Sequence, residues 1–196
     1  MKRFLVALTA ACLCAPAFSA LPVQSLVSNS QDECSFSVRP EAKVTRIGGK
    51  TAGLAGIAMG PAMDRTFYFT LAGHALLNSL STDEPNAVDM SFFNYWDAGL
   101  NLNYTFFSSQ VIHGDVQCLM GGGRATYDYT LGGSDSSTVF ILEPEVDLLV
   151  NLTSTFELGL GVGYRFAAGA SGDKGLASSD LSSLTGTLSL RWTEFW

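Results

Sequence analysis

Charged side chains that could pair, transfer protons or hold an ion recur at every second position in several short segments of the chain. Residues two apart lie on one face of a β-strand, because successive side chains of a strand point to opposite faces. Acids and bases brought to one face can neutralise one another or act as general acids and bases. The residues that we expect to form such a polar network are Arg39, Glu41, Lys43, Asp97, Asp115, Glu143, Glu145, Asp147, Glu157, Arg165 and Arg191.

Catalysis by this set would need further groups. A hydrolase places a histidine beside a serine nucleophile and a carboxylate, and the two histidines of the sequence are His74 and His113. No serine lies within a Gly-x-Ser-x-Gly motif, and no cluster has the spacing of metal ligands. The glycines at 121–123 are interpreted as a bend in a strand rather than a phosphate-binding loop. We therefore predict no catalytic, metal-binding or cofactor-binding residues and no cofactor.

The charged positions belong to eight segments in which apolar and polar residues alternate, the pattern of a strand with one apolar face. In one of them, Phe156, Leu158 and Leu160 alternate with Glu157 and two glycines. The eight predicted strands cover residues 38–47, 51–59, 65–77, 92–106, 110–127, 139–150, 155–167 and 184–196.

The connections between these segments alternate in length. The short connections are 60–64, 107–109 and 151–154, and the longer connections between them are 78–91, 128–136 and 168–179. The connection at 48–50 is the exception, because it is short where a longer one would be expected. Outer-membrane barrels combine an even number of strands with short periplasmic turns and longer external loops. The sequence therefore predicts an all-β fold, an eight-stranded antiparallel transmembrane up-and-down β-barrel.

Alternation alone does not decide which face points outward. A soluble barrel of lipocalin type keeps its apolar face inside to hold a ligand, whereas a membrane barrel exposes that face to lipid. The last segment ends on an aromatic residue, and aromatic side chains of membrane barrels gather at the headgroup boundary. We therefore expect the apolar face to point outward, with Glu194 as the one misfit of the last strand. The predicted C-terminal assembly signal consists of Leu190, Trp192 and Trp196.

The first residues have the pattern of a secretory signal peptide. Lys2 and Arg3 precede a short apolar run, and the small residues at 17–19 fit a cleavage site. A lipoprotein signal with Cys12 or Cys14 as the acylated residue is the alternative, although Thr9 stands where such signals carry a larger aliphatic residue. We expect a signal peptide at 1–19, a short periplasmic segment at 20–35 and the barrel at 36–196.

Composition limits the class of partner. The chain has 11 Lys and Arg against 18 Asp and Glu, and removal of the two N-terminal cations would change the formal charge from −7 to 9 − 18 = −9. An acidic chain without basic clusters does not favour nucleic acid as a partner. Cys34 lies before the first predicted strand and Cys118 within the fifth, so we expect no disulfide between them.

Four stretches resemble the small eight-stranded outer-membrane barrels, of which OmpA and OmpX are examples, and a group of uncharacterised bacterial outer-membrane barrel proteins in particular. They are residues 43–50 (KVTRIGGK), 67–78 (FYFTLAGHALLN), 142–147 (LEPEVD) and 158–165 (LGLGVGYR). The resemblance covers about residues 38–196. It implies an integral protein of the bacterial outer membrane with both termini in the periplasm, and it implies no catalytic residues.

The expected function follows from the size of such a barrel. The interior of eight strands is just wide enough to be filled by side chains, so we expect a structural or surface-interaction role, not an open pore. The alternatives are a small outer-membrane enzyme acting on lipid A and a narrow ion or small-solute channel. The expected partners are outer-membrane lipid and the barrel assembly machinery, which would recognise the last strand, with no nucleic acid and a monomeric state. Any ligand specificity would lie in the loops 78–91, 128–136 and 168–179.

The charges also predict contacts across the barrel. Acids concentrate on the fifth and sixth strands and cations on the first, seventh and eighth, which favours ion pairs between opposite walls. Around the turn at 151–154, Glu143 and Glu145 are expected beside Gly161 and Gly159, which would leave room for long side chains.

Overall fold

The computed structural model describes residues 34–63, 65–78, 90–129, 134–170 and 177–195. The predicted signal peptide, nearly all of the predicted periplasmic segment, most of the loop at 78–91 and Trp196 lie outside the described residues. The strands and the one described helix are β1 (Cys34–Ile47), β2 (Lys50–Met63), β3 (Phe67–Leu76), β4 (Met90–Phe106), β5 (Ile112–Tyr129), β6 (Ser134–Asn151), β7 (Phe156–Ala168), α2 (Ser178–Leu181) and β8 (Ser183–Phe195). Within the described part of the chain, no helix has the length and apolar character needed to cross a membrane.

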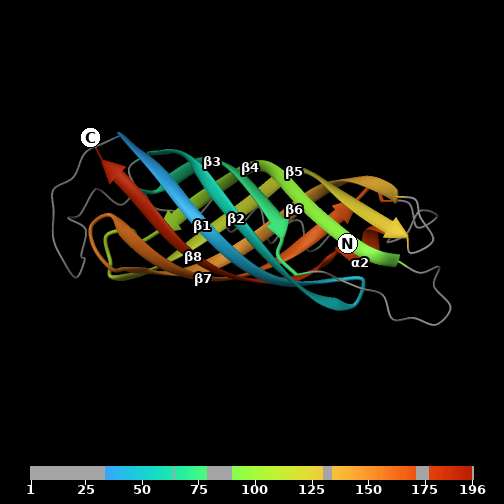
Figure 1. Cartoon of the computed structure of the whole chain (residues 1–196). Helices are drawn as coiled ribbons and strands as arrows, with labels where there is room; N and C mark the ends of the chain where they lie inside the picture. The colour runs from blue at the N-terminus through green and yellow to red at the C-terminus, as the bar shows by residue number, and fades with distance from the viewer. Residues whose placement is uncertain (1–33, 64, 79–89, 130–133, 171–176, 196) are drawn as a thin grey trace, which may run out of the picture.

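The eight strands form one closed barrel. Each strand pairs antiparallel with the next, and β8 pairs with β1 to close the sheet (Figure 1). The predicted eight-stranded antiparallel barrel is thereby confirmed. Ser35 at the start of β1 lies opposite Phe195 at the end of β8. We call this end of the barrel the near end, and the end that carries the β1–β2 turn and α2 the far end.

Two predicted boundaries at the far end were wrong. β5 continues to Tyr129 and β6 begins at Ser134, so the connection is residues 130–133 rather than 128–136. The sequence from 134 to 138 is polar on both faces and therefore lacks the alternation by which strands were assigned. Its strand character comes from pairing with β5, which extends to Asp128 opposite Ser134. The helix α2 was not predicted; it begins in the predicted loop 168–179 and ends two residues after it.

The N-terminal boundary also differs. β1 begins at Cys34 rather than at residue 38, and its first residues pair with the end of β2, where Cys34 lies opposite Met63. Pro40, which lay within the predicted strand, is on the outward face opposite Ile57. Cys118 of β5 is a free, half-buried thiol, in agreement with its predicted place on the apolar face.

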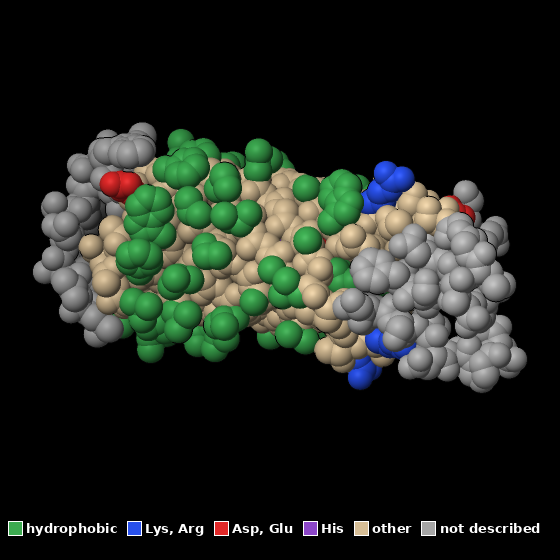
Figure 2. Space-filling view, viewed as in Figure 1, with side chains coloured by type: hydrophobic (Ala, Val, Ile, Leu, Met, Phe, Trp, Pro, Cys, Tyr) green, Lys and Arg blue, Asp and Glu red, His purple; other side chains and the backbone are tan. Residues whose placement is uncertain are grey.

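The outward face of the barrel is apolar. Monomeric soluble proteins rarely expose a contiguous apolar patch larger than roughly 300–600 Å², whereas here large apolar side chains are exposed on every strand. Figure 2 shows them covering the wall from the near end to beyond its middle, with lysine and arginine toward the far end. The lipocalin-like alternative is excluded because the polar face points inward. Exposed examples are Phe36, Met59, Leu71, Leu100, Ile112, Val146, Leu160 and Leu188.

Aromatic side chains gather toward both ends of the apolar wall. At the near end, the ring centroid of Tyr104 lies 4.9 Å from that of Phe67 and 4.6 Å from that of Phe106. Toward the far end, the rings of Tyr164 and Phe166 are 4.6 Å apart. Two aromatic girdles on either side of an apolar band are the arrangement of membrane barrels, where such rings lie at the two headgroup boundaries.

Candidate functional site

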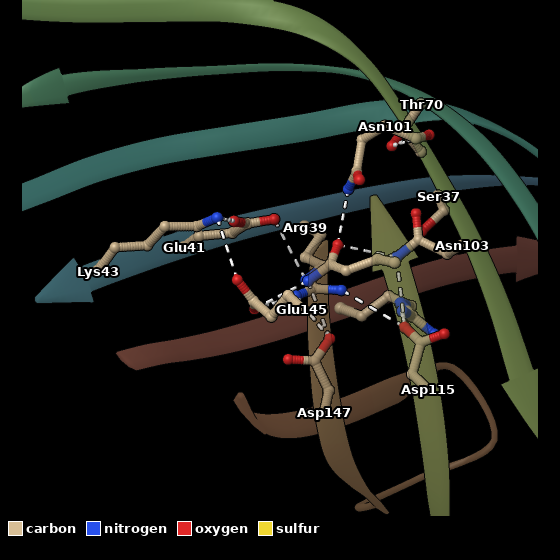
Figure 3. Close-up of polar contacts among 12 residues, drawn as sticks. Ser37, Arg39, Glu41, Lys43, Thr70, Asn101, Asn103, Asp115, Glu145 and Asp147 are labelled. Atoms are coloured by element: carbon tan, nitrogen blue, oxygen red, sulfur yellow. Dashed lines mark hydrogen bonds and ion pairs between the residues drawn. The ribbon is translucent and has the colours of Figure 1, made fainter. Parts of the chain in front are cut away.

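The barrel interior holds the candidate site. All eleven side chains of the predicted polar network are buried there, none more than 6% exposed. They come from β1, β4, β5, β6, β7 and β8, and Figure 3 shows part of the cluster. The seven carboxylates and four cations of this set are packed from mid-barrel toward the near end, except Arg165, which lies toward the far end opposite Ser183 of β8.

Arg39 of β1 lies at the centre of the network. Its Nη2 is 3.2 Å from Asp147 Oδ2 and 3.7 Å from Glu145 Oε1, both on β6. Its Nη1 is 3.6 Å from Asp115 Oδ2 on β5, and its Nε is 3.2 Å from Glu41 Oε1 on the same strand. One guanidinium thus contacts four carboxylates, three of them across the barrel (Figure 3).

Lys43 makes the second set of contacts across the barrel. Its Nζ donates to Glu143 Oε1 at 2.7 Å and to Glu145 Oε2 at 3.3 Å. Glu143 also accepts a hydrogen bond from Arg165 Nε of β7 at 3.0 Å. The Arg165 guanidinium in turn lies over the ring of Tyr95, 5.3 Å from its centroid.

A third cluster lies toward the near end. Arg191 of β8 forms an ion pair with Asp115 and donates from Nη1 to Glu157 Oε2 at 3.1 Å. Its guanidinium stacks on the ring of Tyr68 with 4.2 Å to the centroid. In the β2–β3 turn, Arg65 donates to the carbonyl oxygen of Ser154 at 2.6 Å, so a further buried cation closes this end.

His74 links the network to the far half of the interior. Its Nδ1 is 2.7 Å from Asp97 Oδ1 and its Nε2 is 3.2 Å from Glu41 Oε2. The Tyr95 hydroxyl donates to the other oxygen of Asp97 at 2.8 Å. The result is a continuous chain of hydrogen bonds from Tyr95 through Asp97 and His74 to Glu41.

Three amide side chains, which the sequence analysis did not include in the network, connect its parts. Gln117 Nε2 donates to Glu145 Oε1 at 2.8 Å and to Asp147 Oδ2 at 2.9 Å. Its Oε1 accepts from Asn101 at 2.7 Å and from Asn103 at 3.0 Å. Their positions on the polar face of β4 and β5 were the available signal. An amide can both donate and accept, and here it bridges carboxylates that would otherwise repel one another.

Glycines of β7 create the space for the acids of β6, but in a register that differs from the prediction. Glu145 lies opposite Gly163 and Asp147 opposite Gly161, rather than Glu143 and Glu145 beside Gly161 and Gly159. The turn occupies residues 152–155 rather than 151–154, and the ladder next to it pairs Asn151 with Glu157, which shifts the register. A Cβ atom at Gly161 would overlap the carboxylates of Asp147 and Glu145.

An apolar plug, which was not predicted from the sequence, fills the far end of the interior. Inward-facing side chains near the far ends of the strands replace charges with aliphatic and aromatic groups, and Leu181 of α2 packs among them with no exposed surface. The backbone N–H of Gly48 donates to the carbonyl oxygen of Asp180 at 2.9 Å, which ties α2 to the β1–β2 turn. The plug consists of Ile47, Ala52, Leu54, Phe93, Tyr95, Ala125, Val139, Ile141 and Leu181.

Two residues of the predicted assembly signal, Leu190 and Trp192, are described, and both lie on the lipid-facing side of β8. Leu190 is 39% exposed and Trp192 is half-buried on the same face. Phe156 lies opposite Trp192 on β7, and Val38 lies opposite it on β1. These two residues of the signal therefore belong to the strand that closes the barrel.

Comparison with known proteins gives the fold. No protein-family model matches the chain, and no curated protein matches it in sequence. Neisserial surface protein A has a TM-score of 0.54 and 12% identity, covering 86% of this chain and 100% of its own. The N-terminal β-barrel domain of Pseudomonas aeruginosa OprF has a TM-score of 0.52 and 14% identity, covering 81% and 97%. The chain has the fold of the small eight-stranded outer-membrane β-barrels.

The resemblance predicted from sequence is thus confirmed at the level of fold. At 12–14% identity, no residue role can be carried over from these barrels to this chain. The roles of the interior side chains are therefore inferred from their geometry in this structure. Among the described residues, no group of three or more His, Cys, Asp and Glu is arranged to hold a metal ion. His74 is hydrogen-bonded to two carboxylates, and His113 Nδ1 lies 3.2 Å from the carbonyl oxygen of Gln110. Neither arrangement places a histidine beside a serine nucleophile, which the lipid A enzyme would use under the triad mechanism.

Proposed function

We propose that the protein is a closed, non-conducting barrel of the bacterial outer membrane that serves a structural or surface-interaction role. The observation that carries this proposal is the filled interior of the barrel. Arg39 and Lys43 cross to β6 at mid-barrel, and the apolar plug with Leu181 of α2 occupies the far end. An interior of eight strands offers little more space than its own side chains fill.

The proposed orientation has the near end, with the start of β1 and the end of β8, in the periplasm. At this end the connections β2–β3, β4–β5 and β6–β7 are short, whereas β3–β4 and β7–β8 at the far end are the longest ones. Short periplasmic turns and longer external loops are typical of outer-membrane barrels. Interaction with a partner would then use the far end, at the connections 77–89, 130–133 and 169–182.

The closed interior predicts a result in planar bilayers. We expect the purified chain to insert without steady single-channel conductance, because ions would have to displace both the charge network and the apolar plug. An open porin measured in the same membrane is the control for detection. Reproducible conductance steps of uniform size, proportional to the amount of folded barrel, would contradict the proposal and favour the narrow channel.

We also propose that the last strand directs assembly. β8 closes the barrel by pairing with both β7 and β1, and an assembly machinery can bind such a strand by β-augmentation. Burial of a terminal aromatic side chain contributes at most about 1.5–3 kcal/mol to stability. Trp196 should therefore matter more for delivery to the membrane than for the finished barrel.

The expected result for Trp196→Ser is a lower amount of barrel in the outer membrane of cells, with refolding from urea into detergent unchanged. Thr193→Ser, on the inward face of the same strand, is the control that alters β8 without changing its aromatic end. Equal cellular levels of the two variants, or refolding that fails as badly as delivery, would show that Trp196 is only a structural residue.

A further inference from the structure

A shallow groove lies on the lipid-facing wall across β4, β5 and β6. The pairing register places Trp96, Arg124 and Thr138 in one row across the three strands. The next row toward the near end holds Ala98, Gly122 and Phe140. The groove has a volume of about 440 Å³ and is lined by Trp96, Ala98, Gly122, Gly123, Arg124 and Thr138.

The groove exists because its floor is made of small residues and its rim of large apolar side chains. Ala98 and Gly122 lie side by side with no side chain large enough to cover the sheet. Phe140 at one side is 55% exposed, and Leu100 in the row below is 42% exposed. An apolar floor between apolar rims fits a hydrocarbon chain better than a polar ligand.

Arg124 gives the groove a charged end. It is exposed on the outward face, five residues before β5 ends at the far end of the barrel. Its Nη2 donates to Ser136 Oγ at 2.7 Å, and a guanidinium has five N–H donors, so further donors remain for a ligand. Cations on the lipid face are costly at the membrane midplane and tolerated near the headgroups, which places Arg124 at the headgroup level.

The charges on the wall favour an anionic ligand at this end. Arg46 and Arg124 are exposed on the outward face toward the far end, and the exposed Glu194 lies at the near end. Asp180 is also exposed at the far end, but it belongs to α2 at the barrel mouth rather than to the wall of strands. Asp135, which is next to Ser136, belongs to the inward-facing positions of β6. In the orientation proposed above, the outward cations of the described wall therefore face the outer leaflet, whose lipids carry phosphate groups.

We propose that this groove is a binding site for one phosphorylated lipid of the outer leaflet, lipid A. One acyl chain lies along Ala98 and Gly122 between the apolar rims, and a phosphate accepts hydrogen bonds from Arg124. The planar guanidinium matches a phosphate because it can donate two parallel hydrogen bonds. The inference rests on the orientation given under the proposed function, since only the far end meets the outer leaflet.

A second groove on the other side of β4 provides an internal comparison. Its volume is also about 440 Å³, and it is lined by Ala55, Gly56, Ile57, Gly73, His74, Ala75 and Asp97. No exposed cation is among these lining residues, and the histidine and carboxylate belong to the interior network. Both grooves can take an acyl chain, but only the one beside Arg124 has a donor for phosphate.

The test uses the purified, delipidated chain in a maltoside detergent, titrated with lipid A and with fully dephosphorylated lipid A. Bound lipid is counted by native mass spectrometry. Arg124→Gln removes the charge, and Gly122→Leu fills the groove. The matched controls are Arg46→Gln, another outward cation, and Gly73→Leu, which fills the second groove. A Cβ at Gly122 or Gly73 would meet its nearest neighbour at 3.6 Å or 3.5 Å, so the Cβ of either leucine makes ordinary contacts with the sheet.

We expect Arg124→Gln and Gly122→Leu each to weaken lipid A binding about tenfold, the scale of one charge-assisted hydrogen bond. The controls should stay within about twofold of the parent chain, and Arg124→Gln should no longer distinguish lipid A from its dephosphorylated form. Equal binding by all four variants, or equal loss in the controls, would overturn the proposal because the lipid would then bind the wall without a specific site. Conductance would remain absent in either case, so this failure is distinct from failure of the closed-barrel proposal.

Discussion

Replacing Arg39 with methionine is expected to lower the free energy of unfolding by about 3–5 kcal/mol, the cost of leaving buried charges without their partner. The interior has seven predicted network carboxylates against four cations of the same network. Arg39 alone contacts Glu41, Asp115, Glu145 and Asp147. Methionine keeps much of the side-chain volume but removes the positive charge that contacts all four acids.

Urea-dependent unfolding in lipid vesicles, followed by tryptophan fluorescence, measures this loss. The control is Arg46→Met, which removes an exposed cation of the same strand and should change stability by less than about 1 kcal/mol. Adding Asp147→Asn to Arg39→Met should restore part of the loss, because one of the acids is then neutral. A loss as small as that of Arg46→Met would mean that the interior charges are solvated and that the network does not hold the barrel together.

Replacing Gly161 with valine is expected to destabilise the barrel by about 2–4 kcal/mol, although valine favours strands. A Cβ at Gly161 would overlap the carboxylates of Asp147 and Glu145. Those acids are held by Arg39 and Lys43, so they can move aside only by giving up ion pairs. Overpacking and the loss of buried pairing therefore act together.

Gly186→Val is the matched control, since nothing lies within 4 Å of a Cβ added there and the position faces lipid. Both variants are measured by the same urea unfolding, with the fraction of folded barrel checked by mobility of unboiled samples on a detergent gel. We expect Gly186→Val to be as stable as the parent chain or slightly more stable. Equal effects of the two valines would show that the glycines of β7 do not make space for the acids of β6.

The sequence by itself determined the eight strands, their order and the membrane-type fold. Each of these depends on local alternation: Phe156, Leu158 and Leu160 face one side because a strand has a period of two, wherever it lies in the molecule. The choice of polar side chains for the interior followed from the same rule, and all eleven predicted network residues lie there. Apolar residues on the outside were likewise predictable from the aromatic end of the last strand.

Only the tertiary structure decided which side chains meet. Glu145 lies opposite Gly163 because strand pairing near the turn sets the register, and a shift in register leaves the alternation of each strand unchanged. The contacts of Arg39 with β5 and β6 depend on closure of the sheet, which brings positions more than 70 residues apart across the interior. Leu181 enters the plug because a connection returns into the barrel mouth, where the polarity of the two faces is reversed: the inward Phe93, Tyr95 and Ala125 are apolar, whereas outward neighbours such as Asn94 and Arg124 are polar. A period of two does not say which face points inward at a given height, so this closure of the far end is visible only in three dimensions.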